Sequence, residues 1–171
     1  MAGVKKRRRI ANYLNVSKTA EEEYVFMGTG YKSLEETPAA QTSSTRYIND
    51  ASATKSINGY DWSTPFDLDQ IRDQQAIEFI CEIGETQKTG GECETDYIVV
   101  DLDKQAQTAN AFYARKFRVA IEVASFTNND GQMGATGNLL GIGDLVIGTF
   151  DTTTKTFTEG FEAAPAAPTK E

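Results

Sequence analysis

The stretch YDWSTPFDLDQIRDQQAIEFICEIG, residues 60–84, decides how the rest of the chain is interpreted. From residue 68 onward its apolar residues recur at spacings of three and four, which is the pattern of an amphipathic helix with one buried face. The stripe consists of Leu68, Ile71, Ala76, Ile77, Phe79, Ile80 and Ile83. The stretch therefore predicts one surface helix over about residues 65–83, packed on an apolar layer.

Both ends of this helix carry start and stop signals. Thr64 is a candidate N-cap, and Pro65 fits the first helical position. Asp67 lies where a capping-box acid would reach back to the N-cap. Gly84 is a natural terminator.

Short strands and turns are predicted on either side of the helix, from alternating residues and short apolar runs. We expect strands at residues 10–17, 24–28, 46–62, 97–103, 117–123, 144–150 and 155–161. Within the third of these, Asn58-Gly59 is a typical hairpin-turn dipeptide. Residues 28–45 and 126–143 are rich in turn-forming residues and are predicted to be long loops.

The predicted fold is mainly β, a β-sandwich or flattened barrel with one flanking α-helix over about residues 65–83. It occupies a single domain, residues 10–161, which includes the long loop at 28–45. Residues 1–9 form a basic arm, and residues 162–171 form a flexible tail. The helix would cover an apolar flank or a strand edge that the sheets leave open.

Charge is unevenly distributed along the chain. The formal net charge is −8, yet the arm carries an uninterrupted basic run of Lys5, Lys6, Arg7, Arg8 and Arg9. The body is therefore more acidic than the total suggests, which argues against nucleic-acid binding because acidic surfaces repel phosphates. We interpret the arm as solvated or as docked on an acidic neighbour. A nuclear-targeting or DNA-contacting arm is the alternative.

The sequence lacks the usual groups of an active site. It contains no histidine, the commonest general base and metal ligand. Cys81 and Cys93 are too few for a zinc site and are expected to be reduced thiols. The Gly-rich residues 134–141 lack the Lys-Ser/Thr ending of a phosphate loop. We therefore expect neither an enzyme nor a bound cofactor.

Membrane attachment is not expected either. No apolar run approaches the ~18 residues that a spanning helix needs. The basic start of the chain is not followed by the apolar segment of a signal peptide.

A series of short motifs recurs in a characteristic order along the chain. They are YIN at residues 47–49, INGY at 57–60, PFD at 65–67, GD at 143–144 and GT at 148–149. This succession resembles the major tail proteins, or tail tube proteins, of long-tailed bacteriophages, over roughly residues 10–161. Each motif is weak by itself, and the order carries the resemblance.

The resemblance implies a structural virion protein. Tail tube proteins look like a β-sandwich flanked by one helix, and six copies form a ring. The rings stack into a hollow tube with a continuous inner barrel, through which DNA passes without specific binding. The implied partners are other copies of the chain and the tape-measure, terminator and distal tail proteins. The implied location is the virion tail, after assembly in the host cytoplasm.

The resemblance also suggests where neighbouring subunits would meet, because a long loop and the terminal arms typically bridge subunits or rings in such proteins. The outer side of the helix is a further candidate. The candidate contact residues are Lys5, Lys6, Arg7, Arg8, Arg9, Tyr31, Lys32, Leu34, Glu35, Glu36, Arg72 and Glu78.

Two other functions stay open at the level of the sequence. One is another tail or head–tail joining structural protein with a related fold. The other is a monomeric β-sandwich binding module, for example for sugars, with a platform of exposed aromatic residues. Tyr60, Trp62 and Phe66 could supply such a platform, although their position before the expected helix favours packing.

Overall fold

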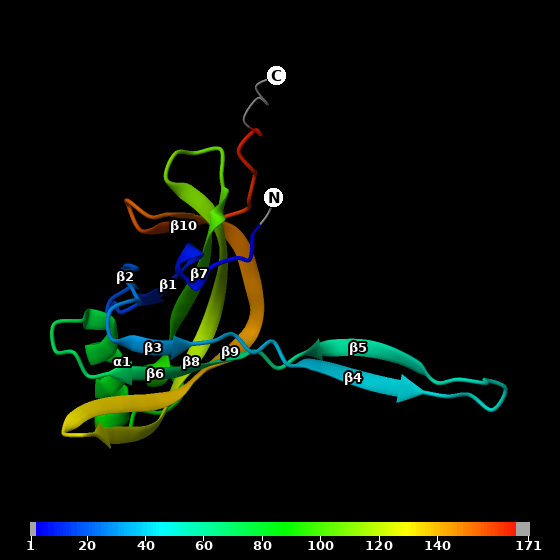
Figure 1. Ribbon diagram of the computed structural model, residues 1–171, viewed down its shortest axis with the longest axis horizontal. Helices are drawn as coiled ribbons and strands as arrows, with labels where there is room; N and C mark the ends of the chain where they lie inside the picture. The colour runs from blue at the N-terminus through cyan, green and yellow to red at the C-terminus, as the bar shows by residue number, and fades with distance from the viewer. Residues whose placement is uncertain (1–2, 167–171) are drawn as a thin grey trace.

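The computed structural model describes residues 3–166, and within them the chain is mostly β with one α-helix. A long antiparallel sheet curls into a half-barrel beside the helix, and a two-stranded hairpin projects far from the body (Figure 1). The main sheet contains β1 Ile10–Asn15, β2 Tyr24–Phe26, β3 Tyr31–Leu34, β6 Ser63–Asp69, β7 Glu94–Gln105, β8 Ala111–Asn129, β9 Gln132–Asp151 and β10 Thr156–Glu159. The mainly β prediction with one flanking helix is thereby confirmed.

The strand order explains the curled shape. It runs β2-β1-β7-β8-β9-β6-β3, and β10 pairs with the last residues of β9. The two longest strands, β8 and β9, form the spine of the molecule and pair along almost their whole lengths. The other elements are the hairpin strands β4 Ala40–Thr45 and β5 Thr54–Tyr60, the helix α1 Gln75–Glu85, and the 3-10 turns η1 Arg7–Arg9 and η2 Gly90–Cys93.

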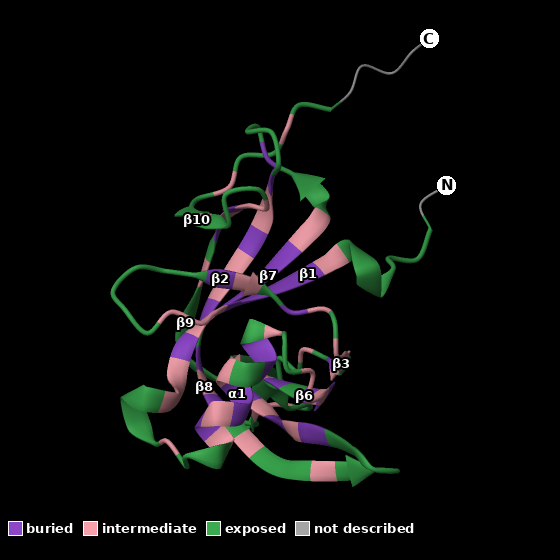
Figure 2. Cartoon of the chain, turned by 90° about the vertical axis from the view of Figure 1, so that its left-hand side faces the viewer, coloured by how far each residue is buried: buried purple, intermediate pink, exposed green. Residues whose placement is uncertain are grey.

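The sheet buries both of its faces, each against a different core. Tyr97 and Val99 of β7 belong to the cluster that includes α1, whereas Ile98 and Val100 belong to the cluster around Phe150. Successive side chains of a strand point to opposite faces, so the run YIVV is buried without interruption. Figure 2 shows buried residues along β1, β7 and β8 and on the helix.

The N-terminal part of the predicted helix is wrong. Residues 63–69 form β6, which pairs with β9 on one side and β3 on the other. Thr64 is a buried strand residue and not an N-cap, and neither Pro65 nor Asp67 lies in a helix. Thr64, Phe66 and Leu68 are buried in alternation with their neighbours, so a period of two governs this segment.

The helix itself begins later and ends differently from the prediction. Gln74 is the N-cap and makes no side-chain capping hydrogen bond. Gly84 lies inside the last turn and does not terminate the helix; a Cβ there would stand 2.8 Å from a methyl carbon of Val123 on β8. The left-handed residue after the helix is Gln87, with φ 52°. Gly84 thus serves close packing of helix on sheet.

Both predicted long loops contain strands. Residues 28–45 include β3 and β4, and residues 126–143 form the end of β8, a tight turn and the start of β9. The turn residues Asp130 and Gly131 have φ 50° and 85°, as the favoured two-residue hairpin turns require. Many of the turn-forming residues here are strand residues, so their composition hid the strands.

The hairpin turn predicted at Asn58-Gly59 is also wrong. Both residues lie within β5, where Gln41 pairs with Gly59 and Thr42 with Ile57, which leaves Asn58 as the extra residue of a β-bulge. The connection between the hairpin strands is residues 46–53. The predicted final strand pair is confirmed, because β9 and β10 pair through Phe150 and Phe157.

Candidate functional site

The hairpin β4–β5 is the most conspicuous surface feature of the molecule (Figure 1). Among the described residues its two strands form a sheet of their own, separate from the main sheet. Its tip exposes two large side chains: Tyr47 is 68% and Ile48 109% exposed. In a monomer these side chains gain nothing from burial, so the tip is a candidate contact surface.

The tip is nevertheless an ordered turn. The Tyr47 backbone N–H donates to the Asp50 carboxylate at 3.1 Å, and the Asp50 N–H donates to the Tyr47 carbonyl at 3.1 Å. The Arg46 Nε also donates to the Asp50 carbonyl at 3.1 Å. These bonds hold Tyr47 and Ile48 outward in a defined conformation.

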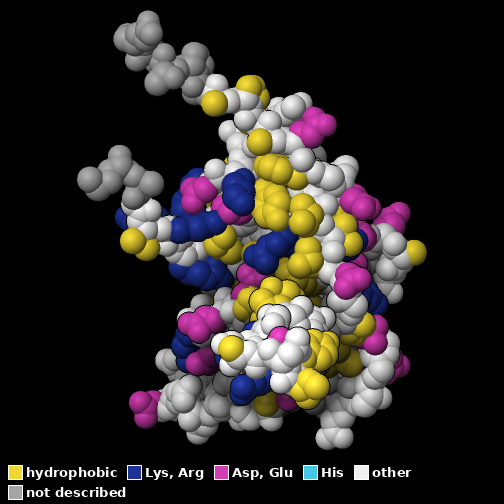
Figure 3. All heavy atoms as spheres, turned by 90° about the vertical axis from the view of Figure 1, so that its right-hand side faces the viewer, with side chains coloured by type: hydrophobic (Ala, Val, Ile, Leu, Met, Phe, Trp, Pro, Cys, Tyr) yellow, Lys and Arg dark blue, Asp and Glu magenta, His cyan; other side chains and the backbone are white. Residues whose placement is uncertain are grey.

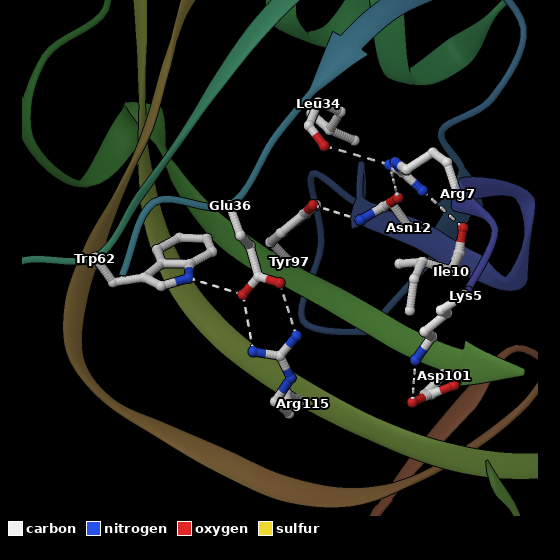
Figure 4. A network of polar contacts seen from close by, with 10 residues as sticks. All are labelled: Lys5, Arg7, Ile10, Asn12, Leu34, Glu36, Trp62, Tyr97, Asp101 and Arg115. Carbon is white, nitrogen blue, oxygen red and sulfur yellow. Dashed lines mark hydrogen bonds and ion pairs between the residues drawn. The ribbon is translucent and has the colours of Figure 1, made fainter. Parts of the chain in front are cut away.

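Glu36 anchors the root of the hairpin to the body (Figure 4). It precedes β4, and its carboxylate accepts hydrogen bonds from Trp62 Nε1 at 2.9 Å and from Arg115 Nη1 and Nη2 at 2.8 and 2.7 Å. Trp62 follows β5 and Arg115 lies on β8, so one carboxylate ties both ends of the hairpin to the spine. Burial opposes the charge of Arg115, but the bonds to Glu36 outweigh it and raise the pKa of Arg115.

A groove of about 440 Å³ lies beside this anchor. The Trp62 ring stacks on Phe117 at 4.0 Å between centroids and 11° between planes, and both rings line the groove. Its other lining residues include Tyr60, Arg118, Asp144 and Leu145. The groove therefore combines an aromatic floor with charges of both signs.

The face that carries the groove is partly apolar. Figure 3 looks onto this face, with the hairpin pointing toward the viewer, and hydrophobic side chains gather in a band over it. Leu145 and Ile147 of β9 are 44% and 48% exposed. Exposed branched side chains at alternate positions of one strand are typical of a surface that meets another protein.

The basic arm is folded onto its own subunit. Lys5 forms an ion pair with Asp101, and Arg9 pairs with Asp103 at 2.7 Å. Arg7 donates to the Asn12 side chain at 2.6 Å and to the Leu34 carbonyl at 3.3 Å (Figure 4). The acidic neighbour on which this arm docks thus includes its own chain.

The remaining arm residues, and two charged residues of the segment predicted as a loop at 28–45, lie on the surface. Lys6, Arg8 and Glu35 are exposed, and Lys32 pairs with Asp69 at 2.8 Å on the surface. These four charged side chains lie on the surface, where a neighbouring subunit could reach them.

Two residues proposed as contacts lie inward instead. Leu34 is buried in the main core of its own subunit. The Tyr31 ring packs against the same core, and its hydroxyl is buried without a hydrogen bond in the described residues. In both cases the side chain lies on the inner face of β3.

The outer face of the helix is exposed as expected. Glu78 faces solvent on α1, whereas Arg72 is exposed in the turn before the helix begins and not on the helix; both lie beside a shallow depression along α1. The aromatic trio suggested for a binding platform does not form one, because Phe66 is buried in the core and Trp62 stacks on Phe117. Tyr60 is the exposed member of the three.

Reactive groups are sparse in the part of the chain that the structure describes. Residues 3–166 contain no group of three or more Cys, Asp or Glu side chains arranged to hold a metal. Burial and the charge of Glu85 raise the pKa of the Cys81 thiol to about 11, which keeps it protonated at neutral pH.

Within residues 3–166, no helix has the length and apolar character needed to cross a bilayer.

Comparison with known proteins places the fold. No family model matches the sequence, and no curated protein matches it. A solved structure does match in three dimensions: a chain in the tail of an empty GTA particle, computed with helical refinement and C6 symmetry. The TM-score is 0.56 with 11% sequence identity, over 83% of this chain and 97% of that chain. What the two chains share is the fold.

Sequence patterns alone do not identify the residues of this site as a group. They place Tyr47 and Ile48 in a strand, and the contact of Glu36 with Arg115 joins residues 79 positions apart. The available signal is Trp62, the one tryptophan of the sequence, beside the hairpin segment, since large aromatic residues usually pack against other side chains.

Proposed function

We propose that this chain is a structural subunit of a phage-like tail tube, in which six copies form a ring and the rings stack. The observation that carries the proposal is the fold match to a chain in a C6-symmetric tail, which spans nearly all of that chain. The ordered motifs that resemble tail tube proteins agree with it.

The shape of the subunit supports assembly. The sheet of the half-barrel ends in the edge strands β2 and β3. Among the described residues, no strand pairs with the outer edge of either one, so both edges can pair with another molecule. The hairpin extends beyond the body, and β9 exposes Leu145 and Ile147. Closing such sheets around a ring would remove the edges and bury the apolar side chains.

The charge of the chain suits a conduit. A net charge of −8 disfavours tight binding of DNA, so nucleic acid could slide through a tube of such subunits without adhering. The role is architectural, with no catalytic step and no bound cofactor. Its partners are other copies of the chain and, by the same resemblance, the tape-measure, terminator and distal tail proteins. It would act in the virion tail after assembly in the host cytoplasm.

The proposal is tested by the mass of the assembled species. Native mass spectrometry over a concentration series should show the 18.7 kDa chain giving way to hexamers and multiples of hexamers. Hexamers that never stack would favour a head–tail joining or terminator role. Monomers at every concentration would refute self-assembly and leave a binding module with the groove beside Trp62 as its site.

A further inference from the structure

We propose that the tip of the hairpin, Tyr47 and Ile48, docks into the groove beside Trp62 of a second copy of the chain. This inference rests on the proposed self-association and deepens it by naming both sides of one contact. The tip and the groove belong to opposite ends of the same hairpin.

The tip is exposed and ordered, and the side chains of Tyr47 and Ile48 are not covered by any other part of the described chain. Tyr47 and Ile48 are the most exposed large side chains of the hairpin, and the turn bonds around Asp50 hold them outward. A flexible loop would lose conformational freedom on binding, whereas this turn is already ordered. The cost of docking is therefore small for two residues of this size.

A subunit cannot fill its own groove with its own tip. Tyr60, at the end of β5, lines the groove, and Tyr47 follows β4 at the far end of the same ladder. With about 3.3 Å per strand residue, the six paired positions separate tip and groove by roughly 20 Å. Figure 1 shows the two strands running straight away from the body. The occupant must come from another molecule.

The chemistry of the groove matches that of the tip. The stacked Trp62 and Phe117 rings and Leu145 offer an apolar surface to Ile48 and Tyr47. A volume of about 440 Å³ lies within the range of roughly 300–1,000 Å³ found for binding pockets. The groove thus has the size and the apolar character for two side chains.

Charge also favours this contact. Arg46 and Asp50 flank the two apolar residues, and the groove carries Asp144 and Arg118. Arg118 already pairs with Asp96 and Glu94 of its own subunit, so the pair of opposite charge open to the tip is Arg46 with Asp144.

Such a contact is heterologous, because two different surfaces meet. Each copy gives one tip and offers one groove, so the contact can repeat without limit or close into a ring. The groove also touches Trp62 and Arg115, which hold the root of the receiving subunit's hairpin through Glu36. A docked tip would therefore restrict the motion of the receiving subunit's own hairpin, whose tip in turn contacts the next copy.

Site-directed disulfide formation tests the contact. Two proteins are prepared in a Cys93→Ser background, one with Ile48→Cys and one with Leu145→Cys, and Cys81 is left in place because it is buried. After mixing and mild oxidation, the expected product is a cross-linked dimer that contains one chain of each kind. The matched control pairs Ile48→Cys with Met133→Cys, an exposed residue at the other end of β9, and should give no such dimer.

Electron micrographs of the same samples separate the possible outcomes. Rings or tubes with the Ile48–Leu145 cross-link support the proposal. Rings or tubes with no cross-link, or with equal cross-linking to Met133→Cys, overturn it while the proposed function stands. Monomers without any cross-link overturn both. As a second measure, Ile48→Ser should raise the concentration needed for assembly by about tenfold or more, since it removes a large apolar contact.

Discussion

At the scale of single residues, Glu36 shows how one carboxylate can set the position of a whole element. Its side chain and that of Arg115 are 25% and 29% exposed, so their ion pair is partly shielded from water. Partial burial makes such a pair costly to break, because the remaining charge loses its partner. The direction in which the hairpin leaves the body thus depends on a contact outside the hairpin.

The substitution Glu36→Gln should destabilise the protein. The new amide side chain would keep one acceptor but turn an N–H group toward the Arg115 guanidinium, which leaves partly buried donors without acceptors. We expect the free energy of unfolding to fall by about 1–3 kcal/mol. Urea denaturation followed by the fluorescence of Trp62, the only tryptophan, measures it. The control is Glu35→Gln at an exposed site, expected within about 0.5 kcal/mol of wild type. Equal losses in both variants would contradict this role.

The arm offers a pH-dependent contact at the same scale. Partial burial acts to raise the pKa of Asp101, but the hydrogen bonds from Lys5 and the Asp103 backbone N–H outweigh it and lower the pKa. A lowered folded-state pKa means that the contact stabilises the fold above the unfolded value of about 3.9. That contribution is lost as the pH falls through the folded pKa.

The variant Lys5→Met should return the pKa of Asp101 toward its ordinary value. A carbon-13 NMR titration of the Asp101 carboxyl group reports it directly. Lys6→Met is the matched control, since Lys6 is exposed and does not contribute to the shift. The arm contact would be disproved by identical titration midpoints in the two variants.

At the scale of elements, the long strands β8 and β9 depend on a close approach between their backbones. A Cβ at Gly137 of β9 would stand 1.9 Å from the Glu122 carbonyl oxygen on β8 and 2.8 Å from the Phe66 ring. Backbone cannot move aside as a flexible side chain can. This glycine is therefore required by packing in the centre of the sheet.

Gly137→Ala should cost about 1–3 kcal/mol of unfolding free energy, or prevent folding, because it forces the spine strands apart. Gly59→Ala is the informative control, since an added Cβ there meets nothing within 4 Å. We expect that variant to unfold within about 0.5 kcal/mol of wild type. Thermal and urea denaturation measure both. A large loss of unfolding free energy in Gly59→Ala would instead indicate that Asn58-Gly59 forms the tight turn that this dipeptide predicts.

The same elements show what the sequence can predict. The apolar period of α1 and the buried runs of β7 and β8 arise from local patterns, so local patterns predict them. The segment Thr64–Asp69 carries local signals for a helix start, but hydrogen bonding to β9 and β3 on both sides fixes it as a strand. The hairpin strands are exposed on both faces, so they show no alternation and resemble a loop and a turn. Pairing between distant segments, which decides each case, is not encoded locally.

At the scale of the whole molecule, the hairpin is separable from the body. The backbone pairs Ala40–Tyr60 through Thr45–Thr54 lie within the hairpin, and the anchor at Glu36 lies outside it. The two cores contain no residue of these strands. Assembly and folding can therefore be tested independently.

Replacing residues 41–59 with Asn-Gly should leave folding intact and abolish assembly. The two-residue turn keeps Ala40 opposite Tyr60, and no core residue is removed. The thermal unfolding midpoint of this variant, followed by circular dichroism, is expected to equal that of the wild-type chain. Sedimentation should show monomers where the wild type forms particles. Particles at the wild-type concentration would exclude a role for the hairpin.

We propose that this chain assembles into a hollow six-fold tube. Electron microscopy of the purified protein across a concentration series tests it most directly. We expect rings that show six subunits in end views and stack into tubes with an open lumen. Monomers at every concentration, or rings with another number of subunits, would contradict it.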